Sequence, residues 1–132
     1  MQSSTILMFR SAAFPAVPGE DEETNPGVYG RALIAWIAQQ LPRFDYGVKR
    51  FVSEDFGRLA EVAYPGLRLY VAASNTDITA TEWRVFAFSE KGFLSRLRGS
   101  TDGSEAISKL MADLKRILSD NADITELREV VV

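Results

Sequence analysis

The chain has 132 residues, of which 46% are hydrophobic and 25% are charged, and its formal net charge is −3. This length and composition fit a single globular domain, residues 1–132. Cysteine and histidine are both absent, which excludes disulfides, thiolate nucleophiles, Cys/His metal sites and histidine-based catalysis. The acidic balance argues against a nucleic-acid partner. No apolar run has the ~18 residues of a membrane span.

The N-terminal segment is apolar and tolerates β-structure. Residues 4–14 read S-T-I-L-M-F-R-S-A-A-F, which predicts a strand buried on both faces. Because no basic and apolar leader is seen at the start, we expect a cytoplasmic protein. Residues 15–24 contain two prolines, a glycine and four consecutive carboxylates at residues 20–23, which predict a solvated acidic loop.

The next segment has the signals of a helix start. Asn25 is a good N-cap, and Pro26 fits the first helical position, where an N–H is not needed. Pro42 predicts that the helix ends near Gln40 or Leu41. The apolar residues that recur at helical spacing are Tyr29, Leu33, Trp36, Ile37 and Leu41.

From residue 46 to residue 90 the pattern becomes that of β-strands. We predict strands over residues 48–53, 58–64, 67–74 and 82–88, arranged as an antiparallel meander, with a hairpin turn at Pro65-Gly66. The third strand alternates, which predicts one face on helices and one in solvent. One of its faces carries Leu67, Leu69, Val71 and Ala73, and the other carries Arg68, Tyr70 and Ser74.

A second helix follows a connector over residues 91–103. Asp102 with Glu105 forms a variant capping box, with Thr101 as an alternative cap. Residues 124–132 form a possible final strand. The order β-α-β-β-β-β-α, with that possible strand, predicts an α+β two-layer sandwich of a four- to six-stranded antiparallel sheet and two helices on one face. The apolar stripe of the second helix consists of Ile107, Leu110, Met111, Leu114, Ile117 and Leu118.

Two adjacent carboxylates, Glu54 and Asp55, raise the question of a reactive pair. Neighbours on a strand point to opposite faces, so they share a proton or a metal only if a bulge brings them together. The interpretation we favour is a turn before Gly57, in which Asp55 bonds nearby amides and Glu54 is solvated. The alternative is a carboxylate-dependent enzyme or a divalent-metal site that also uses Asp77 or Glu82.

Two further features could bind a ligand or a partner. Residues 25–31 place glycines and Arg31 at a helix start, which could receive a small anion, although no phosphate-loop pattern is present. Trp83 is a core residue or, alternatively, an interface anchor at a rim. Tyr70, Arg68 and Arg84 are expected together on the outer sheet face with Phe86 or Phe88. The candidate binding residues are therefore Glu54, Asp55, Arg31, Tyr70, Trp83 and Arg84.

Three short motifs resemble a family. They are N-P-G-V-Y-G-R-A-L-I-A-W-I-A at residues 25–38, E-D-F-G at residues 54–57 and the E-W at residues 82–83. They are similar to small uncharacterised bacterial proteins with a G-R-x-L-x-x-W-[L/I]-A helix and an E-D-W-G segment, in which Phe56 takes the place of the tryptophan. The resemblance spans about residues 25–90. It implies a bacterial cytoplasmic protein and transfers no catalytic residues.

These observations favour a non-enzymatic binding module that recognises a protein, with no catalytic residue, cofactor or metal. One specific form is an immunity or inhibitor protein whose carboxylates cover a basic site of its target. A carboxylate-dependent enzyme or metal site at Glu54 and Asp55, and a small-anion receptor at the first helix, are the alternatives. Homo-oligomerisation through a sheet edge or the outer sheet face competes with all of them.

Overall fold

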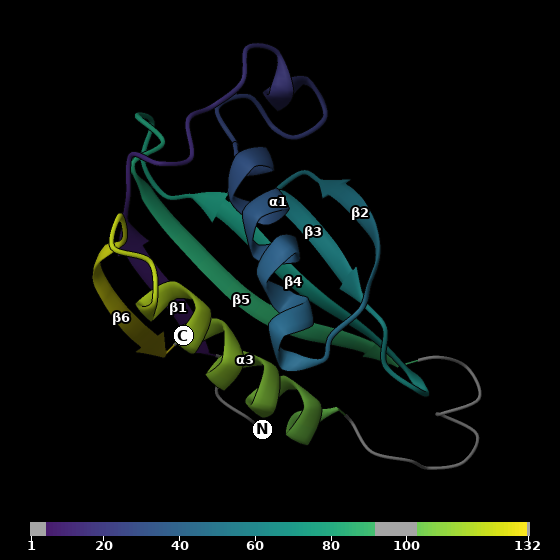
Figure 1. The fold of residues 1–132 in the computed structure, drawn as a ribbon. Helices are drawn as coiled ribbons and strands as arrows, with labels where there is room; N and C mark the ends of the chain where they lie inside the picture. The colour runs from purple at the N-terminus through teal and green to yellow at the C-terminus, as the bar shows by residue number, and fades with distance from the viewer. Residues whose placement is uncertain (1–4, 92–102, 132) are drawn as a thin grey trace.

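The computed structural model describes residues 5–91 and 103–131. In this part of the chain six antiparallel strands form one sheet, and two α-helices cover one of its faces (Figure 1). The two-layer α+β class is therefore confirmed. The elements are β1 (Thr5–Arg10), η1 (Glu20–Glu22), α1 (Arg31–Gln40), η2 (Leu41–Phe44), β2 (Val48–Glu54), β3 (Gly57–Val62), β4 (Leu67–Asn75), β5 (Glu82–Lys91), α3 (Ser104–Ser119) and β6 (Thr125–Val131).

The strand order across the sheet is β2-β3-β4-β5-β1-β6. Strands β2 to β5 form the meander that the alternating pattern predicts. The first strand then lies between β5 and β6, with Leu7 opposite Val85 on one side and Glu129 on the other. The possible final strand is thus present as β6. Strands β2 and β6 are the two edges of the sheet.

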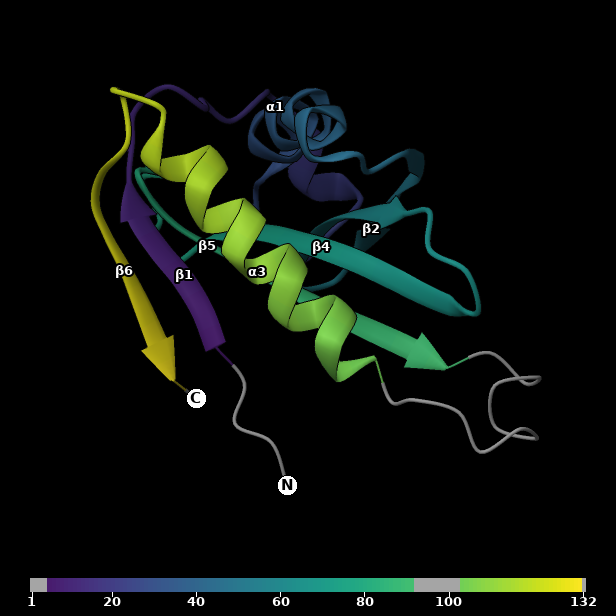
Figure 2. The same cartoon turned by 60° about the horizontal axis from the view of Figure 1, so that its bottom comes forward.

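The core lies between the helices and the sheet. Figure 2 shows that α1 and α3 lie on the same side of the sheet. The helix stripes predict its residues well, because each stripe records the buried face of its helix. The solvated outer face predicted for β4 was wrong, because Tyr70 and Ser74 on that face are also buried. Leu33 and Ile37 of α1 are buried against Leu69 and Val71 of β4. From α3 the buried residues are Ala106, Leu110, Leu114, Ile117 and Leu118.

The first strand is shorter than the predicted 4–14. It ends at Arg10, and Ser11 turns the chain: its backbone N–H donates to the Thr81 carbonyl at 2.9 Å, and its hydroxyl accepts the Ala13 N–H. Phe14 still reaches the core, outside the strand. Burial on both faces was also wrong, because neither described α-helix covers the outer face and Met8 is only half-buried there.

The start of α1 also differs from the prediction. The helix begins at Arg31, with Gly30 as its N-cap, so Pro26 is not at the first helical position. Asn25 lies in a turn, where its carbonyl accepts the Val28 N–H and its own N–H donates to the Asp55 carbonyl. The end at Gln40 agrees with the prediction.

The second helix, α3, begins at Ser104 with Gly103 at the N-cap. Residues 92–102 of the predicted connector lie outside the described residues, and the predicted caps Thr101 and Asp102 are among them. Neither described α-helix is long and apolar enough to cross a membrane.

Candidate functional site

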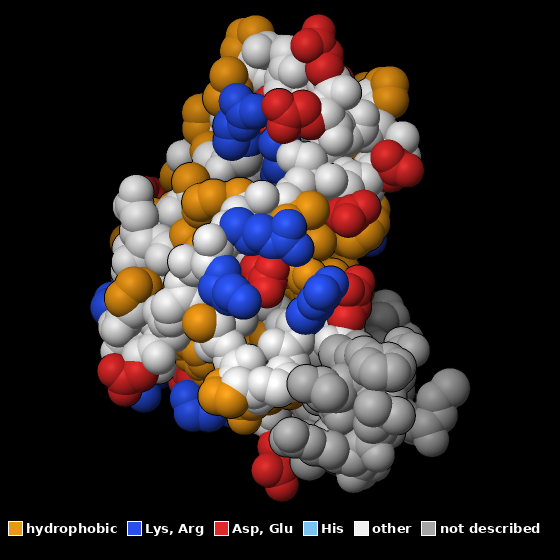
Figure 3. Space-filling model, turned by 90° about the vertical axis from the view of Figure 1, so that its right-hand side faces the viewer, with side chains coloured by type: hydrophobic (Ala, Val, Ile, Leu, Met, Phe, Trp, Pro, Cys, Tyr) orange, Lys and Arg blue, Asp and Glu red, His pale blue; other side chains and the backbone are white. Residues whose placement is uncertain are grey.

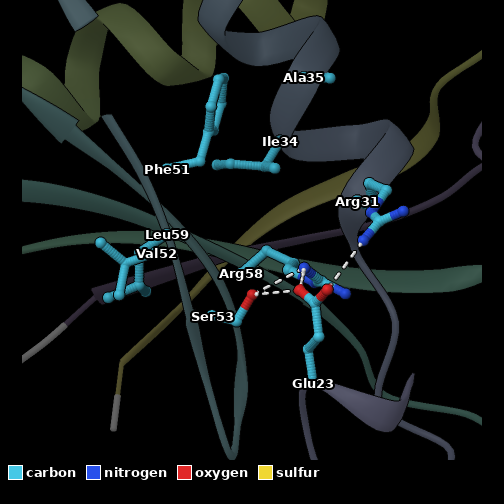
Figure 4. Close-up of a pocket in the computed structure, with 9 residues that line it drawn as sticks. All are labelled: Glu23, Arg31, Ile34, Ala35, Phe51, Val52, Ser53, Arg58 and Leu59. Carbon is cyan, nitrogen blue, oxygen red and sulfur yellow. Dashed lines mark hydrogen bonds and ion pairs between the residues drawn. The ribbon is translucent and has the colours of Figure 1, made fainter. Parts of the chain in front are cut away.

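A cavity of about 300 Å³ opens between the first turns of α1 and the β2–β3 hairpin (Figure 4). One end of it is polar, where Arg58, Ser53 and Glu23 point toward one another. At the other end Phe51 of β2 lies beside Ile34 of α1. Its lining residues are Glu23, Arg31, Ile34, Ala35, Phe51, Val52, Ser53, Arg58 and Leu59.

Arg58 is the charged centre of this cavity. It occupies a position of β3 that shares the helix-facing side with Ala60 and Val62, so its side chain is only 8% exposed. One terminal nitrogen donates to Glu23 Oε2 and to Ser53 Oγ, both at 2.7 Å, and the other donates to the Glu20 carbonyl at 2.6 Å. The Nε–H is buried and has no acceptor among the described residues.

Glu23 closes the polar end of the cavity toward solvent. Its side chain is 56% exposed, and its carboxylate accepts hydrogen bonds from Arg58, from the Ser53 hydroxyl at 3.1 Å and from Arg31 at 3.4 Å. The hydrogen bonds from Arg58 and Ser53 and the guanidinium charges hold the pKa of Glu23 below its usual value. Glu23 is therefore ionised at neutral pH and compensates the buried guanidinium of Arg58.

Glu20 connects the same loop to the helix. It is 2% exposed, which corrects the prediction of a fully solvated acidic loop. Its Oε1 accepts the Val17 N–H at 2.8 Å, and its Oε2 accepts the N–H groups of Gly30 and Arg31 at 3.2 and 3.1 Å. The positive end of the helix dipole and these donors stabilise the buried charge.

The predicted anion site at residues 25–31 is thus filled by the protein itself. Besides the two amides held by Glu20, the Gly27 N–H donates to Asp21 and the Tyr29 N–H donates to the Asn75 side chain. The Val28 N–H donates to the Asn25 carbonyl. Every backbone donor from Gly27 to Arg31 has an acceptor, so no free donor there favours an external anion.

The paired carboxylates lie at the β2–β3 turn. Glu54 pairs with Gly57 across the hairpin, and Asp55 and Phe56 form the connection. Both carboxylates are exposed, and neither takes part in a hydrogen bond or an ion pair within the described part of the chain. It is the backbone carbonyl of Asp55, not its carboxylate, that bonds a neighbour, the Asn25 N–H.

The carboxylates proposed to assist Glu54 and Asp55 are engaged elsewhere. Asp77 accepts the N–H groups of Thr81 and Glu82 in the β4–β5 loop. Glu82 forms ion pairs with Arg10 and Arg128 at 3.2 and 3.4 Å. Among the described residues no three acidic side chains form a group that could hold a metal.

Two of the predicted residues, Tyr70 and Arg84, lie on the outer sheet face at separate positions, and a third does not lie there. Tyr70 stacks on Phe88 with ring centroids 5.2 Å apart, and Arg84 donates to Ser74 at 2.7 Å on the same face. Tyr70 is nevertheless buried, so it offers little contact area. Trp83 points the other way, is 1% exposed and donates its indole N–H to the Ser11 carbonyl. Its side chain lies in the core rather than at a rim.

Sequence reasoning found Arg31 and missed most of the other residues of the cavity. Arg58 follows the alternation of β3 and falls on the inward side with Ala60 and Val62. An arginine at an inward position needs an acceptor, and the acidic loop at residues 20–23 was the obvious supply. A charged residue at an inward-facing position of a strand was therefore the signal in the sequence that could have revealed the cavity.

Comparisons with protein-family models, with curated proteins and with solved structures find no match for this chain.

Proposed function

We propose that this protein is a non-enzymatic binding module that recognises another protein through the edge formed by β2 and α1. The observation that carries the proposal is Phe51, whose side chain is 57% exposed on the edge strand β2 and stands over the cavity. An edge strand offers unpaired backbone groups to an added strand. A large aromatic beside a cavity is a typical anchor of a protein interface.

The surroundings of Phe51 have the composition of an interface. On the side of the molecule that carries β2, basic and acidic side chains alternate with exposed hydrophobic ones (Figure 3). Lys49 and Arg50 of the same strand are held by Glu61 at 3.5 and 2.6 Å. Phe56 at the adjoining turn is also exposed. A hydrophobic centre with a polar rim is the common anatomy of such surfaces.

The specific form that we favour is an immunity- or inhibitor-like protein. Glu54 and Asp55 are exposed at the end of β2, next to Phe56, and are not engaged within the described chain. Two free carboxylates beside a hydrophobic anchor suit a partner with basic groups, because complementary charge speeds and orients association. No observation in the described residues favours a metal site at Glu54 and Asp55 or an anion bound by the backbone amides at the start of α1.

The test compares the wild-type chain with Phe51→Asp as bait in extracts of the native cell. Tyr64→Asp is the matched control, since Tyr64 is also exposed but lies between β3 and β4. We expect one protein to be captured in stoichiometric amount by the wild type and by the control, and to be lost with Phe51→Asp. Thermal melting of all three checks that they fold.

Two results would overturn the proposal. One is a partner retained equally by Phe51→Asp, which would place the interface elsewhere. The other is self-association of the purified wild type, measured by light scattering and abolished by Phe51→Asp, which would make β2 the contact between two copies.

A further inference from the structure

We propose that the cavity beside β2 is a receptor for the C-terminal carboxylate of an extended segment of the partner, and that Glu23 occupies the anion position until the partner displaces it. This inference rests on the proposed function of protein recognition at β2. It adds two points to that function: the group recognised is a carboxylate, and Glu23 of the chain itself competes with it for the cavity.

The first support is the fixed positive charge. Arg58 is buried, and in a site of low polarity its attraction for an anion exceeds that of a surface arginine. Arg31 adds a second guanidinium at the same carboxylate. The buried charge of Glu20 is already engaged by backbone amides. Within residues 5–91 and 103–131, Glu23 is therefore the one side-chain carboxylate that both arginines contact.

The second support is that Arg58 does not depend on Glu23 for its position. Its other contacts, the Ser53 hydroxyl and the Glu20 carbonyl, come from β2 and from the loop. They hold the guanidinium in place when Glu23 leaves. Glu23 itself is half-exposed and follows directly after the short helix η1. The guanidinium of the receptor is thus buried and held by two other acceptors, whereas the carboxylate that fills the site is at the surface.

The third support is the division of the cavity. Arg58, Ser53 and Arg31 form a polar end, while Ile34, Ala35 and Phe51 line the rest. A ligand that fills both parts has a carboxylate next to a sizeable apolar group. A chain end with an apolar last residue has this shape, and a strand added to β2 would deliver it. The side chain of an aspartate or a glutamate has too little apolar surface to fill the part of the cavity that Ile34, Ala35 and Phe51 line.

The test uses a short acetylated peptide of alternating threonine and valine that ends in leucine, either as the free acid or as the amide. Binding is measured by calorimetry to the wild-type chain, to Glu23→Ala and to Glu22→Ala. Glu22 is the matched control, because it is an exposed carboxylate on the same loop. We expect Glu23→Ala to bind the acid about tenfold more tightly than the wild type or the control does, since the internal competitor is gone.

The acid should also bind to Glu23→Ala about tenfold more tightly than the amide, which cannot accept a charge-assisted pair of hydrogen bonds. Arg31→Gln, added to Glu23→Ala, should weaken binding of the acid and leave that of the amide unchanged. Arg31 is used because it is exposed, whereas replacing the buried Arg58 risks unfolding. Equal binding of acid and amide, or binding of neither, would overturn the inference.

Two more probes separate the possible sources of the carboxylate. An amidated peptide with an internal glutamate that binds as well as the free acid would assign the cavity to a side chain instead. Free 4-methylpentanoate that binds as tightly as the peptide would make the cavity a small-molecule site. Both outcomes contradict a chain-end receptor. If Phe51-dependent capture of a partner persists while the acid and amide bind equally, this inference fails and protein recognition stands.

Discussion

At the scale of single residues, Glu20 shows how a buried carboxylate can organise a loop without a basic partner. It accepts three backbone N–H groups, two of them at the N-terminus of α1. Carboxylates with several amide donors are strong acceptors, and the helix dipole adds to this. The same residue offers its backbone carbonyl to Arg58. Glu20 therefore positions both the helix start and the guanidinium of the cavity.

We predict that Glu20→Gln lowers the free energy of unfolding by about 2–3 kcal/mol, because the amide nitrogen cannot accept and a buried N–H loses its charged acceptor. Urea unfolding would measure it. Glu22→Gln, at an exposed position two residues later, should change the free energy by less than about 0.5 kcal/mol. Equal effects of the two substitutions would show that the hydrogen bonds of Glu20 contribute nothing.

The sequence does not distinguish Glu20 and Glu23 from the acidic residues beside them. Four consecutive acidic residues after a proline and a glycine look alike to any local rule, and the solvated loop was the natural prediction. What separates them is contact with residues far along the chain: Glu23 meets Arg58 across 35 positions, and Glu20 meets Arg31 across 11. Most of the cavity was missed for the same reason.

At the scale of elements, two glycines allow α1 and the β2–β3 turn to pack closely on β4. A Cβ atom added at Gly30 would lie 2.6 Å from the Ala73 carbonyl oxygen, and one added at Gly57 would lie 2.7 Å from the same atom. Because this oxygen belongs to the backbone of a central strand, it cannot move aside easily. The glycine behind the paired carboxylates is thus explained by packing.

We predict that Gly57→Ala lowers the free energy of unfolding by about 1–3 kcal/mol, as overpacking does in a tight interior. Gly47→Ala is the matched control, because a Cβ there would meet only the Ala63 Cβ at 3.8 Å, an ordinary contact. Thermal and urea unfolding of both variants measure the difference. A Gly57→Ala chain as stable as the control would refute this account of the turn.

The helices and strands themselves were well predicted, but several of their ends were not. The stripe of α3 records burial directly, so that helix was found. The alternation of β4 located a strand but not its burial, because both faces of β4 are buried. The start of α1 was placed too early, because Asn25 and Pro26 have the local signals of a helix start. The observed start is set by Glu20, which caps the helix from across the loop.

At the scale of the whole molecule, the first strand lies between β5 and β6 and joins the two ends of the described chain into one sheet. No local pattern could place β1 there, because the order of strands depends on pairing between distant segments. The number of layers followed from the apolar stripes, but the neighbours of each strand did not. The edges of the sheet, on one of which the proposed binding surface lies, follow only from the structure.

We predict that the rate of backbone hydrogen exchange depends on the position of each strand in the sheet. Backbone amides of β3, β4, β5 and β1 have strands on both sides and should exchange slowest, while those of β2 and β6 exchange faster through local opening at the edges. The full-length chain is exchanged at neutral pH, and the deuterium taken up by each strand is measured by mass spectrometry of peptides from that chain. Protection in β2 equal to that in β4 would mean that the edge is covered in solution.

The antiparallel pairing of β1 with β6 has a mechanical consequence. Thr5 lies opposite Val131, so the first residue of β1 and the last residue of β6 are at the same end of their ladder of hydrogen bonds. A force that pulls these two residues apart loads the hydrogen bonds one after another, as in opening a zipper, instead of shearing all of them together. The molecule should therefore yield at low force from this end, with β6 peeling away first while the distant β2 edge is still intact.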